Sequence, residues 1–355
     1  MKVLVAGTGP VGRGYAAYLD QRGHEAQLFS PRGRVSGPLR IDTFGYIEAD
    51  VTLPVVDAPA AAGADAVVIA VLGNGLRATI DALVPHLHDG QAVVVSSHSS
   101  FAALYLSRRL AERGVRPLIV AWATTVTGGP MVDGRVHVRL LRGEIDAATI
   151  PAERVDEGVA LSAALFGDRF APSLNLLAIS LSNLNPPIHL ANTLLNFTRV
   201  ENGERWENFG GISPAVGRVI EALDRERLAL AEALGVRVRT VFEHYRKSFS
   251  DMPDEDNVHA LAQKVETQRK GSSPGPTSVN TRFITEDVPF GIQFIVALAR
   301  VCGIAVPVHQ AGLVWAGAAY NYDFADDNDL LPALGLEALS LDTLRAYATE
   351  GWPNA

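Results

Sequence analysis

The chain has 355 residues, of which 48% are hydrophobic and 20% are charged, so it can build a large core and its length suits two average domains. Its formal net charge of -8 argues against a nucleic-acid or anionic-membrane surface, because such surfaces are usually basic. A single cysteine, Cys302, excludes an internal disulfide, and the sequence has no zinc-ligand cluster, signal peptide or membrane-length apolar run, so we expect a metal-free cytoplasmic protein.

A glycine-rich segment follows the first predicted strand. The apolar stretch 2–6 runs into Gly7, Gly9 and Gly12, and a helix and a second strand at 24–29 follow. A GxGxxG pattern in this position is typical of dinucleotide binding, because its glycines permit a tight turn, close approach of the pyrophosphate, and close packing of helix on strand. The predicted cofactor contacts of this segment are Gly7, Gly9, Pro10, Val11 and Gly12.

The end of the second strand usually discriminates between the two nicotinamide cofactors. An acidic residue there binds the ribose 2′-hydroxyl, whereas arginines accommodate a 2′-phosphate. Here Ser30, Arg32 and Arg34 follow the strand, and no acid is present. These residues favour NADP(H) over NAD(H); the alternative is that both arginines are solvated loop residues.

Three further apolar runs, 64–71, 91–97 and 116–126, are predicted to be strands separated by helical stretches. Such runs suit a parallel sheet that is covered on both faces. Val71 and Leu72 lie where the first run ends. Because open α/β sheets bind their ligands at the carboxyl ends of the strands, we expect both residues to contact the cofactor.

Two more segments complete the first half of the chain. The segment 124–130 is a second candidate cleft loop, and the alternating segment 134–146 is predicted to be a strand or hairpin that closes the domain. The strand signals then fade. The predicted fold is α/β, with an N-terminal Rossmann parallel sheet in residues 1–177 followed by an all-α C-terminal domain in residues 178–355.

The segment 185–196 predicts an apolar helix with one polar stripe, and Asn185 is its predicted cap. The polar residues spaced at i, i+3, i+4 and i+7 are His189, Asn192, Thr193 and Asn196. They share one face of the helix, which usually borders water, a cleft or a partner. Two interpretations of His189 are open at this point, a half-buried histidine held by hydrogen bonds or a functional residue at a cleft.

The rest of the second half also reads as helical, with helices expected over 213–236, 239–249, 289–303 and 308–320. The intervening segment 268–280 is rich in Gly, Pro and Ser and is interpreted as a mobile loop near the cleft, in a position to close over a substrate. The apolar helices serve either as the core of this domain or as the interface of a homodimer.

Arg282 and Asp287 lie five residues apart, just before Pro289 opens an apolar helix. Taken alone, this is a loop with a capping acid. Together, however, "NPPIH" at 185–189, "RFITEDVPFG" at 282–291 and the long helix "ISPAVGRVIEALDRERLALAEALG" resemble the opine dehydrogenases of the octopine/nopaline type. The resemblance extends from the N-terminus to the closing "LGLEALSLDTLRAY" segment.

The resemblance implies an NAD(P)-dependent enzyme that joins the amino group of an amino acid to a 2-oxo acid through an imine. It implies that His189 is the catalytic histidine, that Asp287 pairs with it, and that Arg282 receives a substrate carboxylate. These residue types suit the chemistry, because histidine exchanges protons near neutrality, a carboxylate fixes its tautomer, and a guanidinium binds a carboxylate bidentately. Asn192 lies one turn beyond His189 and is either a substrate contact or a support for the site.

One segment departs from the family pattern. Residues 209–211 read Phe-Gly-Gly, where an aromatic pair and an acidic residue are expected before the glycine. The departure predicts unusual specificity for the amino donor, or a related reaction such as simple imine reduction.

Two other functions remain as alternatives. A ketopantoate-reductase-like enzyme acting on a 2-oxo or hydroxy acid generally relies on a lysine. The lysines of the second half lie in polar stretches, at Lys247, Lys264 and Lys270. A non-catalytic NADP(H) sensor would need the glycine motif but has no need for His189, Arg282 and Asp287 together.

Overall fold

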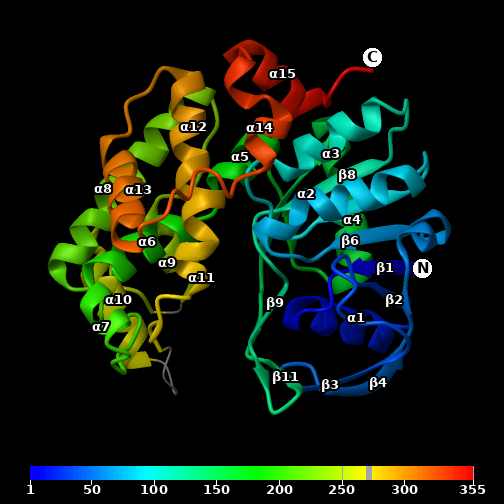
Figure 1. The fold of residues 1–355 in the computed structure, drawn as a ribbon, viewed down its shortest axis with the longest axis horizontal. Coiled ribbons are helices and arrows are strands. Elements are labelled where there is room, and N and C mark those ends of the chain that lie inside the picture. The colour runs from blue at the N-terminus through cyan, green and yellow to red at the C-terminus, as the bar shows by residue number, and fades with distance from the viewer. Residues whose placement is uncertain (250, 269–273, 355) are drawn as a thin grey trace. The chain divides into compact units, whose positions relative to one another are not determined.

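The computed structural model describes residues 1–249, 251–268 and 274–354, which form two compact units (Figure 1). The first unit contains Met1–Ser180 together with the C-terminal segment Asp342–Ala355, and the second contains Leu181–Leu341. The sequence had assigned all of residues 178–355 to the helical domain, whereas the C-terminal segment groups with the first unit.

Contacts of Trp352 explain this return of the chain. The N–H of Trp352 donates to the hydroxyl of Ser107 at 2.9 Å, across a sequence separation of 245 residues. The guanidinium of Arg108 lies over the Trp352 ring, 4.9 Å from its centroid. Both partners belong to α3 (Ala102–Ala111). No local pattern indicates contacts between residues so far apart in the sequence.

The first unit is built on an eight-stranded sheet in the order β14-β13-β8-β7-β6-β1-β2-β5. Its strands are β1 (Lys2–Ala6), β2 (Glu25–Phe29), β5 (Val55–Val56), β6 (Ala66–Ile69), β7 (Ala92–Val95), β8 (Leu118–Trp122), β13 (Ile145–Ile150) and β14 (Phe170–Pro172). The strands from β8 to β5 pair in parallel, and β13 runs antiparallel to β8. The predicted Rossmann architecture is confirmed.

Helices accompany this sheet, because a connection between two parallel strands must return from the carboxyl end of one strand to the amino end of the next. They are α1 (Pro10–Gln21), α2 (Gly73–Leu83), α3, α4 (Val155–Phe166), α5 (Leu176–Leu181) and α15 (Leu341–Glu350). The central strands are fully buried and rich in valine, and Tyr15 and Leu19 of α1 pack in the same core as Val5 and Val68. Each such buried apolar side chain contributes roughly 1.5–3 kcal/mol to folding.

A second, four-stranded sheet was not predicted. It has the order β10-β11-β3-β4, with β3 (Leu39–Gly45), β4 (Ala49–Leu53), β10 (Met131–Val132) and β11 (Arg135–Val138). The segment 134–146 is therefore not one closing hairpin. It is divided between β11, which pairs with β3, then β12 (Leu140–Leu141), which pairs with β9 (Thr127–Gly128), and the start of β13. Pairing with β3 is long-range, so alternation alone could not assign it.

The second unit is helical in its described residues, as expected. Its elements are α6 (Asn185–Leu195), α7 (Phe197–Glu201), α8 (Pro214–Leu234), α9 (Val241–Ser248), α10 (Val258–Gln268), α11 (Arg282–Thr285), the π-helical turn η4 (Val288–Ile292), α12 (Gln293–Cys302), α13 (Pro307–Tyr320) and α14 (Leu330–Leu334). Within the described ranges, no helix has both the length and the apolar character that crossing a membrane requires.

Helix α8 is central to this unit, since α6, α10, α12 and α13 all pack against it. It begins at a Ser213 cap that accepts from the N–H of Val216, and it ends at Gly235 in the left-handed conformation (φ +72°), as the sequence predicted. The predicted cap of α6 is wrong. Asn185 is the first helical residue, and the side chain of Asn183 accepts from its N–H at 3.0 Å.

Candidate active site

His189 and Asp287 meet in the helical unit although 98 residues separate them in the sequence. His189 lies near the start of α6, and Asp287 immediately precedes η4. The Nδ1 of His189 lies 2.7 Å from Oδ2 of Asp287, and the two side chains are 12% and 16% exposed. A carboxylate at Nδ1 holds the proton on that nitrogen, which leaves Nε2 as the atom that can accept or give a proton.

A close backbone approach brings the two motifs together. A Cβ at Gly291 would lie 2.3 Å from Cγ of Pro186, so only glycine lets η4 pack against the first turn of α6. The proline of "NPPIH" and the glycine of "DVPFG" therefore face one another. This contact explains why the two motifs contain a proline and a glycine at these positions, because it sets the distance between α6 and Asp287, the residue that pairs with His189.

Phe283 fixes the plane of the imidazole. Its ring is stacked on that of His189, with centroids 3.6 Å apart and an angle of 8° between the planes. Phe283 lies in α11, the short helix that begins after Thr281, whose hydroxyl accepts from the N–H of Phe283. The sequence alone did not single out Phe283 as a site residue. Its position inside "RFITEDVPFG" was the available signal.

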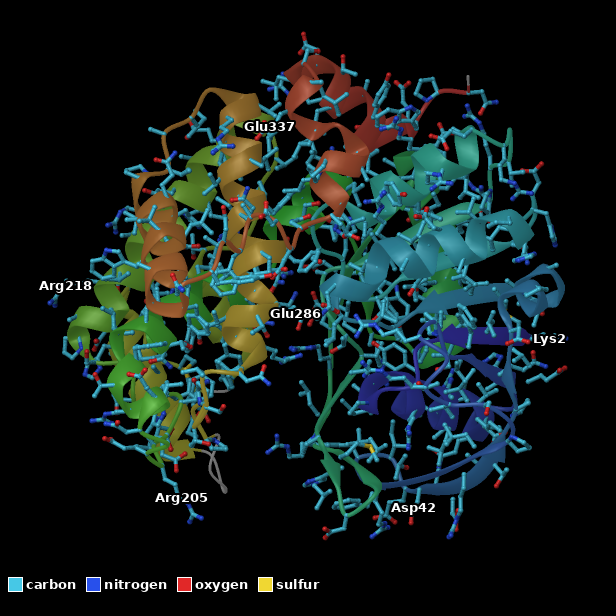
Figure 2. All side chains as sticks on the ribbon, viewed as in Figure 1. Lys2, Asp42, Arg205, Arg218, Glu286 and Glu337 are labelled. Atoms are coloured by element: carbon cyan, nitrogen blue, oxygen red, sulfur yellow. The ribbon has the colours of Figure 1, made fainter. Side chains whose placement is uncertain are left out.

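Arg282 precedes the stacking residue and is exposed. Its side chain is 62% exposed, and its Nη1 lies 3.9 Å from Oε2 of Glu286, which is marked in Figure 2. An ion pair of this length at an exposed site contributes little to stability. The guanidinium of Arg282 therefore keeps most of its donors for another partner.

Asn192 is buried rather than open to a cleft. Its residue is 1% exposed, and its Nδ2 donates to both the backbone oxygen and Oδ1 of Asn208, at 2.8 and 2.9 Å. Asn196 in turn donates to Oδ1 of Asn192 at 3.1 Å. Thr193, on the same helical face, is fully buried. The polar stripe of α6 therefore packs partly on the segment that precedes α8, which favours a supporting role for Asn192.

The segment 268–280 lies partly outside the described residues, because 269–273 are not described. The part that follows is attached to Trp206, whose Nε1 donates to the oxygen of Pro276 and whose oxygen accepts from the N–H of Gly275. A Cβ at Gly211 or Gly275 would lie 2.3 Å from the Trp206 ring. Gly211, in the segment that departs from the family pattern, therefore leaves the space that the Trp206 ring occupies.

The first unit has a turn suited to a dinucleotide. A Cβ at Gly7 (φ +143°) would lie 2.2 Å from the oxygen of Ala70, and one at Gly12 would lie 2.1 Å from the oxygen of Gly7. The fold itself requires these two glycines. Gly9 has ordinary dihedral angles, and nothing lies within 4 Å of the Cβ it lacks. Open space at the N-terminus of α1 is what a pyrophosphate needs, so these residues fit a nicotinamide dinucleotide.

The remaining predicted cofactor residues lie on two neighbouring loops. Arg32, after β2, donates through Nη2 to the backbone oxygen and Oδ1 of Asn74, at 3.2 and 2.9 Å. Asn74 is the second residue of α2, two positions after Leu72. The structure therefore brings the loops after β2 and β6 together. The other two predicted residues of the first loop are Ser30, which is buried, and Arg34, which is exposed.

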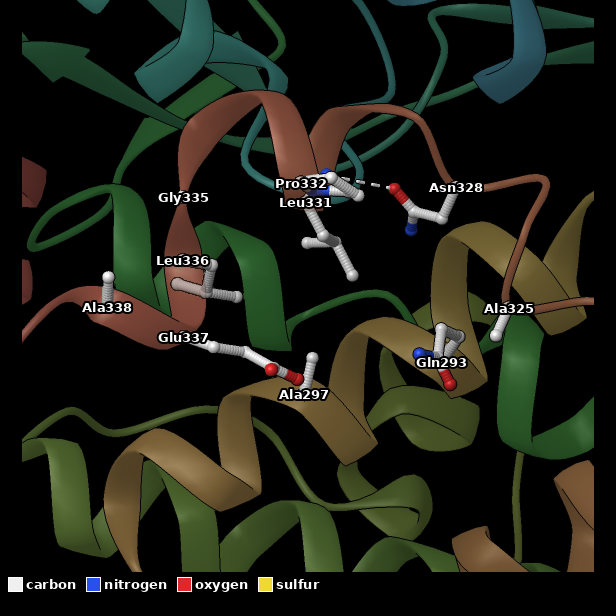
Figure 3. Close-up of a pocket in the computed structure, with 10 residues that line it drawn as sticks. All are labelled: Gln293, Ala297, Ala325, Asn328, Leu331, Pro332, Gly335, Leu336, Glu337 and Ala338. Carbon is white, nitrogen blue, oxygen red and sulfur yellow. Dashed lines mark hydrogen bonds between the residues drawn. The ribbon is translucent and has the colours of Figure 1, made fainter.

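A separate pocket of about 360 Å³ lies in the helical unit between α12 and α14 (Figure 3). Its polar lining residues are Gln293, Asn328 and Glu337. Asn328 donates to the oxygen of Pro289, which ties the pocket wall to η4. Neither His189 nor Asp287 lines this pocket.

Comparison with known proteins identifies relatives over nearly the whole chain. Residues 172–320 match the family model for the alpha-helical domain of NAD/NADP octopine/nopaline dehydrogenases. An opine dehydrogenase of Arthrobacter sp. (strain 1C) is 27% identical, over 96% of this chain and 97% of the relative. Octopine dehydrogenase in complex with NADH and agmatine superposes with a TM-score of 0.80 at 18% identity, covering 98% of both chains. NADP+-bound yersinopine dehydrogenase superposes at 0.74 and 16% identity, covering 99% of this chain and 98% of that one.

A parallel sheet with a glycine-rich first turn, followed by a helical unit with a histidine–aspartate pair, defines the chain as a nicotinamide-dependent oxidoreductase. Similarity to an opine dehydrogenase over nearly the whole chain, and the match of residues 172–320 to the helical-domain model, show an NAD(P)-dependent oxidoreductase that acts on CH–NH bonds. The family resemblance seen in the two short motifs is thereby confirmed.

Proposed function

We propose that the protein reductively condenses an amino acid with a 2-oxo acid, using His189 as general acid and base and Asp287 as its partner. The observation that carries the proposal is the 2.7 Å contact between Nδ1 of His189 and Asp287, in a pair that is neither fully buried nor fully exposed. A bound nicotinamide cofactor supplies the hydride that reduces the C=N bond. The chain must then bind two carboxylates and manage the protons.

His189 manages the protons through Nε2. This atom takes up the two protons of the attacking amine one after the other and passes each to the carbonyl oxygen, which leaves as water, so the amine and the oxo acid give an imine and water without an external acid. Reduction of the imine needs one further proton on nitrogen, which comes from the solvent. Asp287 stabilises the imidazolium formed each time His189 holds a proton of the amine. Stacking on Phe283 keeps the ring in one plane, so Nε2 keeps its direction.

Arg282 is the proposed receptor for a substrate carboxylate in the helical unit. Its exposure and its weak contact with Glu286 support this role. Asn192 is proposed to support the site through Asn208 rather than to contact the substrate.

For the cofactor we propose a preference for NADP(H). Arg32 is positioned by Asn74 beside the loop that begins at Val71, and no acidic residue follows β2. A guanidinium fixed there suits a 2′-phosphate better than a free ribose hydroxyl. We expect Arg32→Ala to raise the Kd of NADPH about tenfold or more and to leave that of NADH within about twofold. Fluorescence titration of both cofactors measures this, and an equal loss for both would contradict the preference.

The experiment that tests the reaction follows NADPH oxidation with a panel of amino acids mixed with pyruvate, glyoxylate or 2-oxoglutarate. The wild type and His189→Gln are assayed side by side. We expect oxidation that needs both an amine and an oxo acid, with kcat at least about 10²-fold lower in the variant and the Kd of NADPH unchanged.

The other outcomes identify the alternatives. Oxidation with an oxo acid alone would favour a ketoreductase, although Lys247 and Lys264 are exposed on α9 and α10 and Lys270 lies outside the described residues. Tight NADPH binding without turnover for any pair would favour a sensor.

A further inference from the structure

Arg142 is anchored in the first unit at the end of the ribbon formed by β9 and β12. Its N–H donates to the oxygen of Val126 at 3.0 Å. The N–H of Val126 donates to the hydroxyl of Tyr15 at 2.8 Å, and this hydroxyl shares a hydrogen bond of 2.7 Å with Ser96. Arg142 is thus linked to α1, to the residue after β7 and to the segment that follows β8.

This position lies at the ligand-binding edge of the sheet. Strands β1, β6, β7 and β8 are parallel neighbours, so their carboxyl ends share one edge with the Gly7 turn. Strand β9 packs along α1, the helix that opens after this turn (Figure 1). In open α/β sheets, ligands bind outside the carboxyl ends of the strands.

The guanidinium of Arg142 has no partner among the described residues. Its Nε is buried without a hydrogen bond, and no described carboxylate pairs with the side chain. Burial lowers the pKa of Arg142, and the one described residue that opposes this shift is Tyr15. Leaving a cation partly buried without a counterion is costly, so such a group usually meets an anion that the protein itself does not supply.

Two other arginines among the described residues, one buried and one half-buried, have hydrogen-bond partners for their guanidinium groups. Arg227, 1% exposed, donates to Asp224 and to the backbone oxygens of Leu181 and Arg239. Arg169 donates to the backbone oxygens of Phe166 and Arg142 and to a tyrosine hydroxyl. The missing partner of Arg142 is therefore a feature of this site and not a general property of how arginines pack in this fold.

We propose that Arg142 binds a carboxylate of one of the two reactants at the carboxyl edge of the first unit's sheet. The proposal rests on the proposed function for the identity of the anion, because both the amino acid and the 2-oxo acid bring one carboxylate. A guanidinium binds a carboxylate through two parallel N–H···O bonds, which orients the carbon next to it. Arg142 is then a substrate-binding residue that the glycine motif and the histidine motif do not reveal.

The test compares Arg142→Gln and Arg142→Lys with Arg139→Gln. Arg139 lies on the same ribbon with an exposed side chain, so its variant makes the same change of charge without removing the unpartnered group. Pyruvate, glyoxylate and the active amino acids are titrated calorimetrically into protein saturated with NADP+, where no hydride is available and the ligand is not consumed. The KM of each reactant is measured in parallel with NADPH.

We expect Arg142→Gln to raise the Kd and the KM of one reactant about tenfold or more. Arg142→Lys should raise both values less, and Arg139→Gln should leave them unchanged. If Arg142→Gln loses oxo-acid binding, Arg142 binds the carboxylate of the oxo acid. If it loses amino-acid binding, Arg142 binds the carboxylate of the amino acid. The NADP+ affinity should stay within about twofold in all three variants.

The proposal is overturned if both reactants bind Arg142→Gln as they bind the wild type, or if the NADP+ affinity falls while carboxylate binding is unchanged, since the anion would then be a cofactor phosphate. Carboxylate binding that depends on Arg142 in a protein that turns over no amine–oxo-acid pair would sustain this inference and count against the proposed reaction. Turnover of an amine–oxo-acid pair that does not depend on Arg142 would support the proposed reaction and overturn this inference.

Discussion

Two histidine–carboxylate pairs among the described residues of the helical unit have the same length and different surroundings. His189 with Asp287 and His309 with Glu226 both place Nδ1 2.7 Å from a carboxylate oxygen. His309 is fully buried, and its Nε2 has no partner among the described residues. His189 is 12% exposed and stacked on an aromatic ring.

The two carboxylates also differ in what else they bind. Glu226 of α8 accepts from the backbone N–H groups of Val308 and His309, at 2.7 and 3.0 Å, and so caps the first turn of α13. It therefore fixes a helix start as well as a histidine. Distance alone does not make a catalytic pair. The imidazole of the pair at Asp287 is partly exposed, whereas that of the pair at Glu226 is fully buried.

The comparison is tested most strongly by replacing each carboxylate with its amide. We expect Asp287→Asn to lower kcat by about 10²–10⁴-fold with little change in the urea midpoint, because the amide no longer fixes the tautomer or stabilises the imidazolium. Glu226→Gln should keep kcat within about twofold and lose about 1–3 kcal/mol of unfolding free energy, because helix-start N–H groups lose a charged acceptor. Steady-state kinetics and urea unfolding of both variants measure the two effects.

If instead Glu226→Gln abolished turnover in folded protein, or if Asp287→Asn lost stability but not turnover, the roles assigned to the two pairs would be reversed. The two substitutions change size and polarity equally, so each serves as the control for the other.

A smaller effect separates the pairs by pH. Burial alone would raise the pKa of Glu226, but hydrogen bonds from the His309 side chain and from the N–H groups of Val308 and His309 hold it below its usual value. A carboxyl with a depressed folded pKa stabilises the fold above its unfolded pKa, near 4.3, and this contribution is lost as pH falls through the folded pKa. The gap in unfolding free energy between wild type and Glu226→Gln should therefore be full at pH 7 and shrink below about pH 4.3.

Urea unfolding of both proteins at several pH values measures this gap. His98, buried in the first unit with its pKa lowered to about 3 by desolvation, is present in both proteins and cancels in the difference. A gap that stayed constant down to pH 3 would show that the charge of Glu226 contributes nothing.

Local patterns were enough to predict some parts of the molecule. The turn at Gly7 and Gly12 belongs to one strand–turn–helix unit, and the caps of α8 are set by Ser213 and Gly235 within that helix. The position of His189 on a helix that begins near residue 185 could be predicted from the sequence. Its contact with Asp287 stays a long-range feature, because it depends on the approach of Gly291 to Pro186, which no periodicity encodes.

Features defined by distant partners could not be predicted. Strand β3 pairs with β11, about half of the first unit's sequence away, and Trp352 returns the C-terminus to α3. The unpartnered state of Arg142 is harder still to predict, because the lack of an acid nearby is a property of the whole fold. Asn192 was placed on the correct helical face, but the segment ending at Asn208 covers it.

The smallest effect that distinguishes the two pairs concerns the aromatic ring on His189. Phe283→Leu keeps an apolar side chain next to the imidazole but removes the flat surface that stacks on it at 3.6 Å. Because an aromatic contact of this kind is worth about 0.5–1.5 kcal/mol, we expect kcat to fall roughly two- to tenfold as Nε2 gains freedom to turn. The Kd of NADPH should stay the same, and Asp287→Asn combined with Phe283→Leu should lose little more than Asp287→Asn alone, since both act through one ring. Additive losses in the double variant would mean that Phe283 contacts the substrate and does not act by orienting His189.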